Sequence, residues 1–143
     1  MRIALDPYMF RRVPLADLPA LVADLGYSWI ELSPRDDFMP FFLHPRADRA
    51  QIAAFSRALN AAGVQVASVL PLYRWSGPGE DERQAAVRYW KRAIQVTADL
   101  GATVMNSEFN GRPEAAAASE AQFWRSMEEL LPVFEREGIR LVL

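Results

Sequence analysis

The sequence predicts an α/β fold built from repeated βα units. Four glycines, Gly26, Gly63, Gly101 and Gly138, recur at intervals of 37 or 38 residues. Each follows a segment with helical periodicity and leads into a short apolar run, which is typical of a helix that ends on glycine before a strand. A fixed period of this length indicates stacked supersecondary units. We therefore expect one domain over residues 1–143 with the order β-α-β-α-β-α-β-α-β.

The uniform repeat also predicts how the strands are arranged. Right-handed crossovers give a parallel sheet, with the helices on one face if the sheet curls. A doubly wound open sheet is the alternative, but no Gly-x-Gly-x-x-Gly phrase follows the first predicted strand. Eight units of this size give roughly 300 residues, within the usual range of a (β/α)₈ barrel. Four βα units plus a fifth strand therefore predict the N-terminal half of a TIM barrel.

The first unit begins with a strand at 2–5, which should end before Pro7 because proline cannot donate to a ladder. Pro14 is expected at the first helical position of the helix that follows. The apolar residues of that helix recur at helical spacing: Leu15, Leu18, Val22 and Leu25. A second strand is predicted at 27–32, followed by a long, proline-interrupted loop at 33–47.

The three later helices share a start signal, a short capping side chain followed three residues on by Gln. The pairs are Asp48 with Gln51, Asp81 with Gln84, and Ser119 with Gln122. The helix from Asp81 is expected to expose a polar face made of Arg88, Lys91, Arg92 and Gln95. Pro132 lies inside the last helical pattern, so we expect a kink or a fresh helical turn there.

Composition limits the classes of protein to consider. The chain has 51% hydrophobic residues, enough for one sizeable core, and a net charge of −2 that favours neither nucleic acid nor a membrane as a partner. No apolar run is long enough for a membrane span and no signal-peptide pattern opens the chain, so the cytoplasm is expected. The absence of cysteine excludes disulfides, thiolate nucleophiles and Cys-type zinc sites.

The loops predict which end of the sheet is functional. Helix-to-strand connections are one or two residues around each glycine, whereas the strand-to-helix segments 6–13, 33–47, 70–80 and 107–118 are long. Half of the 16 aromatic residues lie in these long loops, which suggests that they line or cover a cleft. They are Tyr8, Phe10, Phe38, Phe41, Phe42, Tyr73, Trp75 and Phe109.

Strand parity predicts a polar cluster at that end. The fifth residue after three of the repeat glycines is Glu31, Ser68 or Asn106, and Glu108 follows two positions later. Side chains alternate between the faces of a strand, so these four should point the same way, into the barrel mouth. Polar groups there must pair with one another, with water or with a ligand.

Each candidate also has a structural interpretation. Glu31 could pair with Arg35 or Arg2, and Glu108 with Arg74 or Arg112. His44 could be a packed loop residue, Arg74 could stack on the Trp75 ring, and Asp36 and Asp37 could be turn acids. A single histidine and no spaced ligand pair give no metal motif within the chain. No nucleophile elbow surrounds Ser68 or Ser107.

Several phrases of the sequence resemble one known family. They are Asp6-Pro7-Tyr8, the Gly-Tyr-x-x-Ile-Glu-Leu phrase at 26–32, and the segments 70–75, 106–111 and 131–138. Through them the whole chain resembles the N-terminal half of the xylose isomerase-like TIM barrels, the sugar phosphate isomerase/epimerase group. The resemblance implies one divalent metal (Mn, Mg or Zn) and proton transfer next to a sugar carbonyl by carboxylate bases. It also implies that the metal ligands lie beyond Leu143, so we expect none in this chain and no activity from this part alone.

The resemblance implies a role for the polar loops as the substrate side of the cleft. We expect Glu108 to be catalytic and seven residues to bind substrate: Tyr8, Glu31, Arg35, His44, Arg74, Trp75 and Asn106. The expected partner is a sugar or polyol. Homo-oligomers are also expected, because the first strand and 140–143 would be unpaired sheet edges.

Other functions on the same scaffold remain open at this point. A sugar dehydratase or lyase, or a hydrolase such as an abasic-site nuclease, would use a similar barrel. The acidic balance disfavours the nuclease, because binding to a phosphate backbone needs clustered Lys and Arg. A non-catalytic half-barrel is the third alternative.

Overall fold

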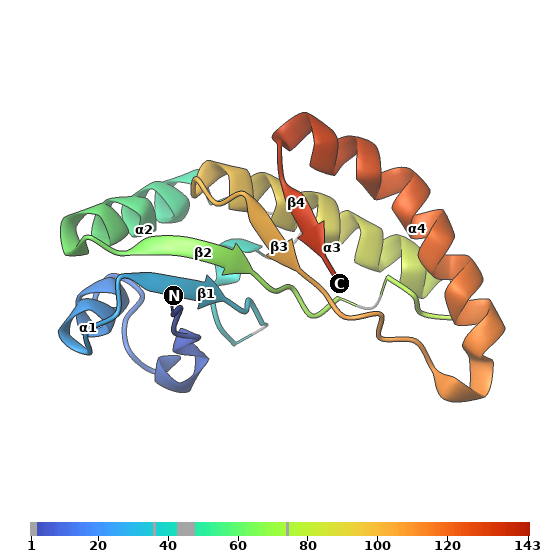
Figure 1. The fold of residues 1–143 in the computed structure, drawn as a ribbon, viewed down its shortest axis with the longest axis horizontal. Helices are drawn as coiled ribbons and strands as arrows, with labels where there is room; N and C mark the ends of the chain where they lie inside the picture. The colour runs from blue at the N-terminus through green and yellow to red at the C-terminus, as the bar shows by residue number, and fades with distance from the viewer. Residues whose placement is uncertain (1–2, 36, 43–47, 74) are drawn as a thin grey trace.

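The computed structural model describes residues 3–35, 37–42, 48–73 and 75–143 of the chain. Within these residues, one parallel sheet has the strand order β1-β2-β3-β4, with a helix between each pair of neighbours (Figure 1). The strands are β1 (Trp29–Leu32), β2 (Gln65–Val69), β3 (Val104–Asn106) and β4 (Arg140–Val142). The helices are α1 (Leu18–Asp24), α2 (Arg49–Ala62), α3 (Glu80–Asp99) and α4 (Ala116–Glu137), with 3₁₀ turns η1 (Pro7–Phe10), η2 (Pro40–Phe42) and η3 (Pro113–Ala115).

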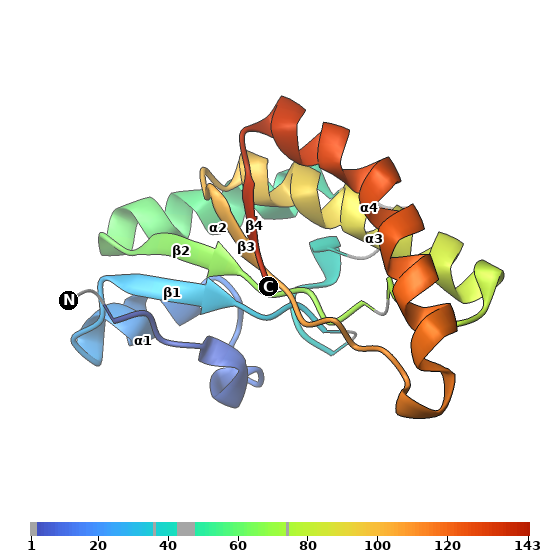
Figure 2. The same ribbon diagram turned by 45° about the vertical axis from the view of Figure 1, so that its right-hand side comes forward.

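The sheet is curled. In both views β4 is steeply inclined to β1, and α2, α3 and α4 lie along one side of the strands (Figures 1 and 2). Gly63 and Gly138 adopt left-handed φ values of 67° and 65° where α2 and α4 end, so each helix turns directly into the next strand. The predicted βα repeat is thereby confirmed.

The first predicted strand is reduced to a single bridge. The Leu5 amide donates to the Trp29 carbonyl (3.0 Å), and the Glu31 amide donates to the Leu5 carbonyl (3.0 Å). Pairing ends there because Asp6 accepts a hydrogen bond from the Tyr8 amide (2.9 Å) and starts η1. The expectation of a strand at 2–5 is thus wrong for residues 3 and 4, while residue 2 lies outside the described residues.

The core lies between the sheet and the helices. Alternate strand residues are buried on the helix side, including Ile30, Leu32 and Met105. They meet the apolar faces of the helices, whose buried residues recur with the helical period.

Of the three helix-capping residues predicted from the sequence, one caps its helix in the structure. Asp48 caps α2 by accepting from the Gln51 amide (3.0 Å). Helix α3 begins one residue before Asp81, after Gly79, and no side chain caps it. Helix α4 begins at Ala116, because the alanine run continues the helix upstream, and Ser119 instead accepts a hydrogen bond from the Arg112 amide (3.1 Å).

The expected start of α1 needs correction, as does the fresh helical turn, which was one of the two outcomes considered at Pro132. Helix α1 begins at Leu18 and not at Pro14, and Leu25, expected to face the core, is 48% exposed after the helix has ended. No second helix begins at Pro132, because α4 passes through it as one element. Pro132 is on the exposed side of α4, where a carbonyl left without a helical donor can bond to water.

Arg92 was expected to face water, yet it is buried beside η2. One guanidinium nitrogen donates to the Phe41 carbonyl (2.9 Å), while Nε has no partner within the described residues. This burial lowers the pKa of Arg92. The helical period alone misplaced Arg92, because η2 packs over the side of α3 that would otherwise meet solvent.

Candidate functional site

Three side chains from consecutive strands meet at the carboxyl end of the sheet. The Ser68 hydroxyl and the Asn106 amide nitrogen both donate to Oε2 of Glu31. These residues stand near the ends of β2, β3 and β1, so the prediction that they point the same way is confirmed for these three of the four residues. The register explains part of this contact: Ile30 pairs with Val66 but Glu31 pairs with Ser68, which leaves Ala67 as an extra residue in β2.

The Glu31 carboxylate is partly buried, and one of its two oxygens accepts both of these hydrogen bonds. Both neutral donors bond to Oε2, whereas Oε1 has no hydrogen bond within the described residues. An ionised carboxylate accepts only, and its second oxygen can accept from a ligand hydroxyl. Two fixed donors also restrict rotation of the carboxylate, so this second oxygen has a set direction.

A second cluster brings together two predicted binding residues, Tyr8 and Arg35. The Arg35 guanidinium lies 4.1 Å from the centroid of the Tyr8 ring, and that of Arg11 lies 4.8 Å from it. Asp37 completes the cluster, with an ion pair to Arg11 (3.2 Å) and contacts from the Tyr8 hydroxyl (3.4 Å). Arg35 therefore stacks on tyrosine and does not pair with Glu31.

Asp6, which was not predicted as a site residue, links the Tyr8 segment to the end of β1, the strand that carries Glu31. Asp6 accepts from the Ser33 hydroxyl (2.9 Å to Oδ1 and 3.0 Å to Oδ2) and from the Tyr8 amide. These bonds hold the loop after Leu5 against the end of β1. The signal available in the sequence was the position of Asp6 directly before Pro7 and that of Ser33 at the same parity as Glu31.

Glu108 lies in the loop after β3 with an exposed side chain. Strand β3 ends at Asn106, so the direction of the Glu108 side chain is set by the loop and not by strand parity. Its backbone carbonyl accepts from the Trp75 indole (3.2 Å). The ion pair considered with Arg112 is not formed, because Arg112 pairs with Glu82 (3.6 Å).

The predicted contact of Trp75 with substrate needs correction. Trp75 is 0% exposed, and its ring stacks on Trp90 with centroids 4.2 Å apart and 10° between the planes. Phe38, Phe41 and Phe42 are buried too, so these loop aromatics extend the core and do not line an open cleft. Phe109, at 44% exposure, is the loop ring that meets solvent most clearly.

Three residues from the sequence analysis lie outside the described residues. These are the predicted binding residues His44 and Arg74, and Asp36, which was considered as a turn acid. In the described part of the chain, no group of three or more His, Cys, Asp or Glu side chains is arranged to hold a metal ion. The described residues by themselves therefore do not fit the divalent metal that the resemblance implies.

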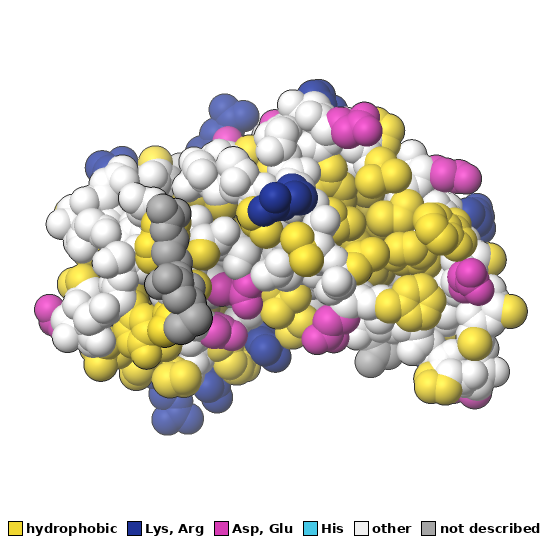
Figure 3. Space-filling model, in the orientation of Figure 1, with side chains coloured by type: hydrophobic (Ala, Val, Ile, Leu, Met, Phe, Trp, Pro, Cys, Tyr) yellow, Lys and Arg dark blue, Asp and Glu magenta, His cyan; other side chains and the backbone are white. Residues whose placement is uncertain are grey.

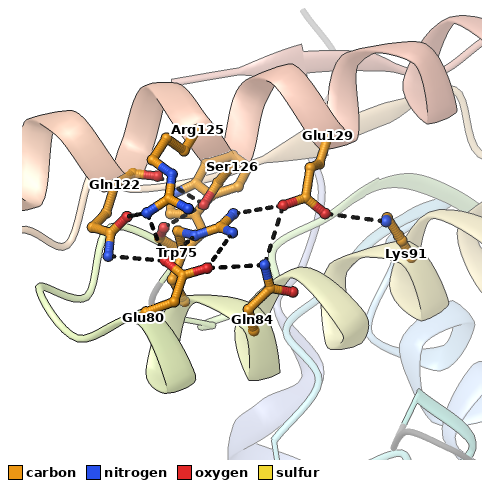
Figure 4. A network of polar contacts seen from close by, with 9 residues as sticks. Trp75, Glu80, Gln84, Lys91, Gln122, Arg125, Ser126 and Glu129 are labelled. Carbon is orange, nitrogen blue, oxygen red and sulfur yellow. Dashed lines mark hydrogen bonds and ion pairs between the residues drawn. The ribbon is translucent and has the colours of Figure 1, made fainter.

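A polar network joins α3 to α4 (Figure 4). The buried guanidinium of Arg83 bonds to Glu80 (2.8 Å) on its own helix and to Glu129 (2.8 Å) on α4. Arg125 adds a bond to Glu80 (2.8 Å). This network was not predicted from the sequence, although Glu80 and Arg83 at i and i+3 were a local signal.

The network shifts the pKa values of its members. The hydrogen bond from Arg83, supported by one from Gln84, lowers the pKa of Glu80 to about 2 from its ordinary value of 4.5. The bond from Arg83 also lowers the pKa of Glu129, and the bond to Glu80 raises the pKa of Arg83. All three groups are therefore charged at neutral pH, and they hold α3 and α4 together through charge-assisted bonds.

A curled parallel βα sheet with polar residues at the carboxyl ends of its strands defines part of a TIM barrel. A family model described as "Xylose isomerase-like TIM barrel" matches residues 19–143. The chain belongs to this family of xylose isomerase-like TIM barrels, as the sequence resemblance indicated. A comparison with curated proteins finds no match.

Solved structures show the same fold over about half of their length. A 3-keto-D-glucoside 4-epimerase from E. coli is 15% identical to this chain, with a TM-score of 0.78. The match covers 100% of this chain and 55% of the epimerase chain. A D-psicose 3-epimerase, in the presence of D-fructose, is 15% identical with a TM-score of 0.69, covering 92% and 46%. A family protein from Mycobacterium smegmatis in complex with magnesium is 19% identical with a TM-score of 0.69, covering 92% and 47%.

Proposed function

We propose that this chain provides the substrate side of a sugar isomerase or epimerase site. The observation that carries the proposal is the convergence of Ser68 and Asn106 on Glu31 at the end of the sheet where TIM barrels carry out their chemistry. The free Oε1 of Glu31 accepts a sugar hydroxyl in a fixed direction. The sugar-acting epimerases of the same fold support a sugar or polyol as the substrate.

Glu108 is proposed as the catalytic carboxylate. It is exposed on the loop that directly follows Asn106, and its carboxylate has no partner within the described residues. Proton transfer next to a carbonyl needs a base that reaches the carbon acid, and an exposed, unpaired carboxylate is available for this. Tyr8 and Arg35 are proposed to bind substrate from the neighbouring loop, where their stacked pair presents an aromatic ring and a cation.

A divalent metal is proposed for the whole barrel and not for this chain alone. The magnesium complex of a family member supports its use in the family. When bound, such a metal stabilises the negative charge that develops on the carbonyl oxygen. Its ligands are proposed to lie beyond Leu143, because the described residues offer no suitable cluster.

Self-association of this 143-residue chain is proposed as well, with a second copy covering its apolar face. Figure 3 shows a broad apolar area over α4 and beside the C-terminal strand. A groove of about 400 Å³ there is lined by Phe123, Trp124, Met127, Glu128, Leu131, Leu141 and Leu143. Within the described residues β4 pairs only with β3, so an open strand edge adjoins the groove and favours a second chain. No helix in the described part of the chain is long and apolar enough to cross a membrane.

The experiment that tests the sugar site is an NMR titration of the ¹⁵N-labelled chain with D-fructose. The expected result is amide shifts confined to the strand ends around Glu31, Ser68 and Asn106, lost in Asn106→Ala. Thr103→Ala serves as the matched control, because Thr103 precedes the same strand at its opposite end. Shifts at the opposite end of the sheet, or none at all, would contradict the proposed site.

A further inference from the structure

Two consecutive carbonyls of the Glu108 loop are held by two consecutive side chains of another loop. The indole nitrogen of Trp75 donates to the Glu108 carbonyl (3.2 Å), and the Ser76 hydroxyl donates to the Phe109 carbonyl. The donors follow β2 and the acceptors follow β3, so the bonds join neighbouring loops at the carboxyl edge of the sheet. We call this pair of contacts the Trp75–Ser76 bracket.

The donor side of the bracket is fixed from two helices. The ring of Trp75 stacks on Trp90 of α3 and meets the edge of Phe123 of α4, with centroids 5.9 Å apart. The Ser126 hydroxyl, also on α4, donates to the Trp75 carbonyl (2.7 Å; Figure 4). Trp75 and Ser76 are both 0% exposed, so neither has room to change its rotamer.

The acceptor side is constrained by its own backbone. Asn110 has a left-handed φ of 53°, a conformation that asparagine tolerates better than most residues. A Cβ on Gly111 would clash with the ring of Phe109, so the chain passes that ring closely only because the residue is glycine. Phe109 in turn packs against Phe123, with centroids 5.4 Å apart. The backbone conformation and the packing of Phe109 therefore both restrict the loop 108–111.

We propose that Trp75 and Ser76 are positioning residues that fix the Glu108 backbone and so aim its carboxylate at the substrate. This inference rests on the proposed function, in which Glu108 acts on a sugar. It gives Trp75, which is too buried to touch a substrate, a defined role in the site. It also explains why a buried indole bonds to the carbonyl of the exposed residue proposed as catalytic.

The test compares two tryptophan variants of the same ring stack in the 143-residue chain. Trp75→Phe keeps an aromatic ring but removes the N–H that bonds to Glu108. Trp90→Phe is the matched control, because it removes an equally buried indole N–H that bonds to the Tyr73 carbonyl (3.3 Å). We expect the ¹⁵N order parameters of 108–111 to fall below about 0.6 in Trp75→Phe and to stay near 0.85 in Trp90→Phe. Ser76→Ala, measured in parallel, should loosen the same four residues.

A titration with D-fructose adds the functional readout. Affinity should fall by about three- to tenfold in Trp75→Phe, the range for loss of one hydrogen bond, and stay within twofold in Trp90→Phe. Unchanged order parameters in both Trp75→Phe and Ser76→Ala would overturn the bracket. A loosened loop with unchanged affinity would overturn its positioning role. Absence of D-fructose binding by the unsubstituted chain would instead count against the proposed function, while the order parameters would still decide whether the bracket holds the loop.

Discussion

The Ser68 hydroxyl donates to the Glu31 carboxylate across 37 residues of sequence, one full repeat of the chain. The two residues are also Cα partners in neighbouring parallel strands. Equivalent positions of successive repeats are thus placed side by side by the fold. Asn106, the equivalent residue of the next repeat, donates to the same carboxylate oxygen.

This arrangement predicts the effect of removing Glu31. Glu31→Ala leaves the donors of Ser68 and Asn106 without their acceptor, which should lower the free energy of unfolding by about 1 to 3 kcal/mol. Urea unfolding followed by circular dichroism measures the change. Glu120→Ala, at an exposed position of α4, is the control and should be nearly neutral. A neutral Glu31→Ala would show that the cluster contributes little to stability.

Removing the charge of Glu108 should lower turnover and leave stability unchanged, unlike the removal of Glu31. In a complete barrel that contains this chain, Glu108→Gln should lower turnover on the sugar substrate by about 10²-fold or more if the carboxylate transfers a proton. Stability should stay unchanged, because the side chain is exposed and makes no bond within the described residues. Steady-state kinetics and thermal melting distinguish the two effects, with Glu114→Gln as the control in the same loop region. Loss of stability with intact turnover would make Glu108 a structural residue.

Acid should weaken the contact between α3 and α4. The pKa of Glu80 is about 2 in the folded chain against an ordinary value of 4.5, so folding favours the ionised form. Its stabilising contribution is therefore present above about pH 4.5 and is lost as the pH falls toward 2. The lowered pKa of Glu129 acts in the same direction. Urea unfolding measures the free energy of unfolding at pH 7 and at pH 3. This free energy should decrease less for Glu80→Gln than for the unsubstituted chain. Equal decreases in the two proteins would exclude the network as the cause.

Self-association should depend on the apolar face of α4. Trp124 is 58% exposed and Leu131 is 47% exposed, so a charge at either position should weaken a dimer without disturbing the core. We expect Leu131→Glu to shift sedimentation velocity profiles toward the monomer. Met9→Glu, at a more exposed apolar residue of η1, should leave the profiles unchanged. A monomeric unsubstituted chain at all concentrations would contradict this proposal.

The candidate site was predictable where it depends on strands and less so where it depends on loops. Glu31, Ser68 and Asn106 were placed together from the sequence because alternation along a strand and a fixed repeat determine which way each points. Trp75 was expected to contact the substrate because it lies in a long loop. In the structure, the loop folds back and buries the ring against Trp90. The link between Asp6 and Ser33 could not be predicted from the position of each residue alone, because it joins two loops 27 residues apart.

The sequence by itself determined the βα repeat, the strand faces and the polar cluster at the strand ends. These features follow from local rules: glycine ends a helix where a left-handed residue is needed, and side chains alternate along an extended chain. Only the tertiary structure decided that Arg83 and Arg92 are buried cations, that Trp75 and Ser76 hold the Glu108 loop, and that the first strand shortens to Leu5. Such contacts depend on how helices and loops pack across long stretches of sequence, and the same side chain would be exposed or buried with a different neighbour.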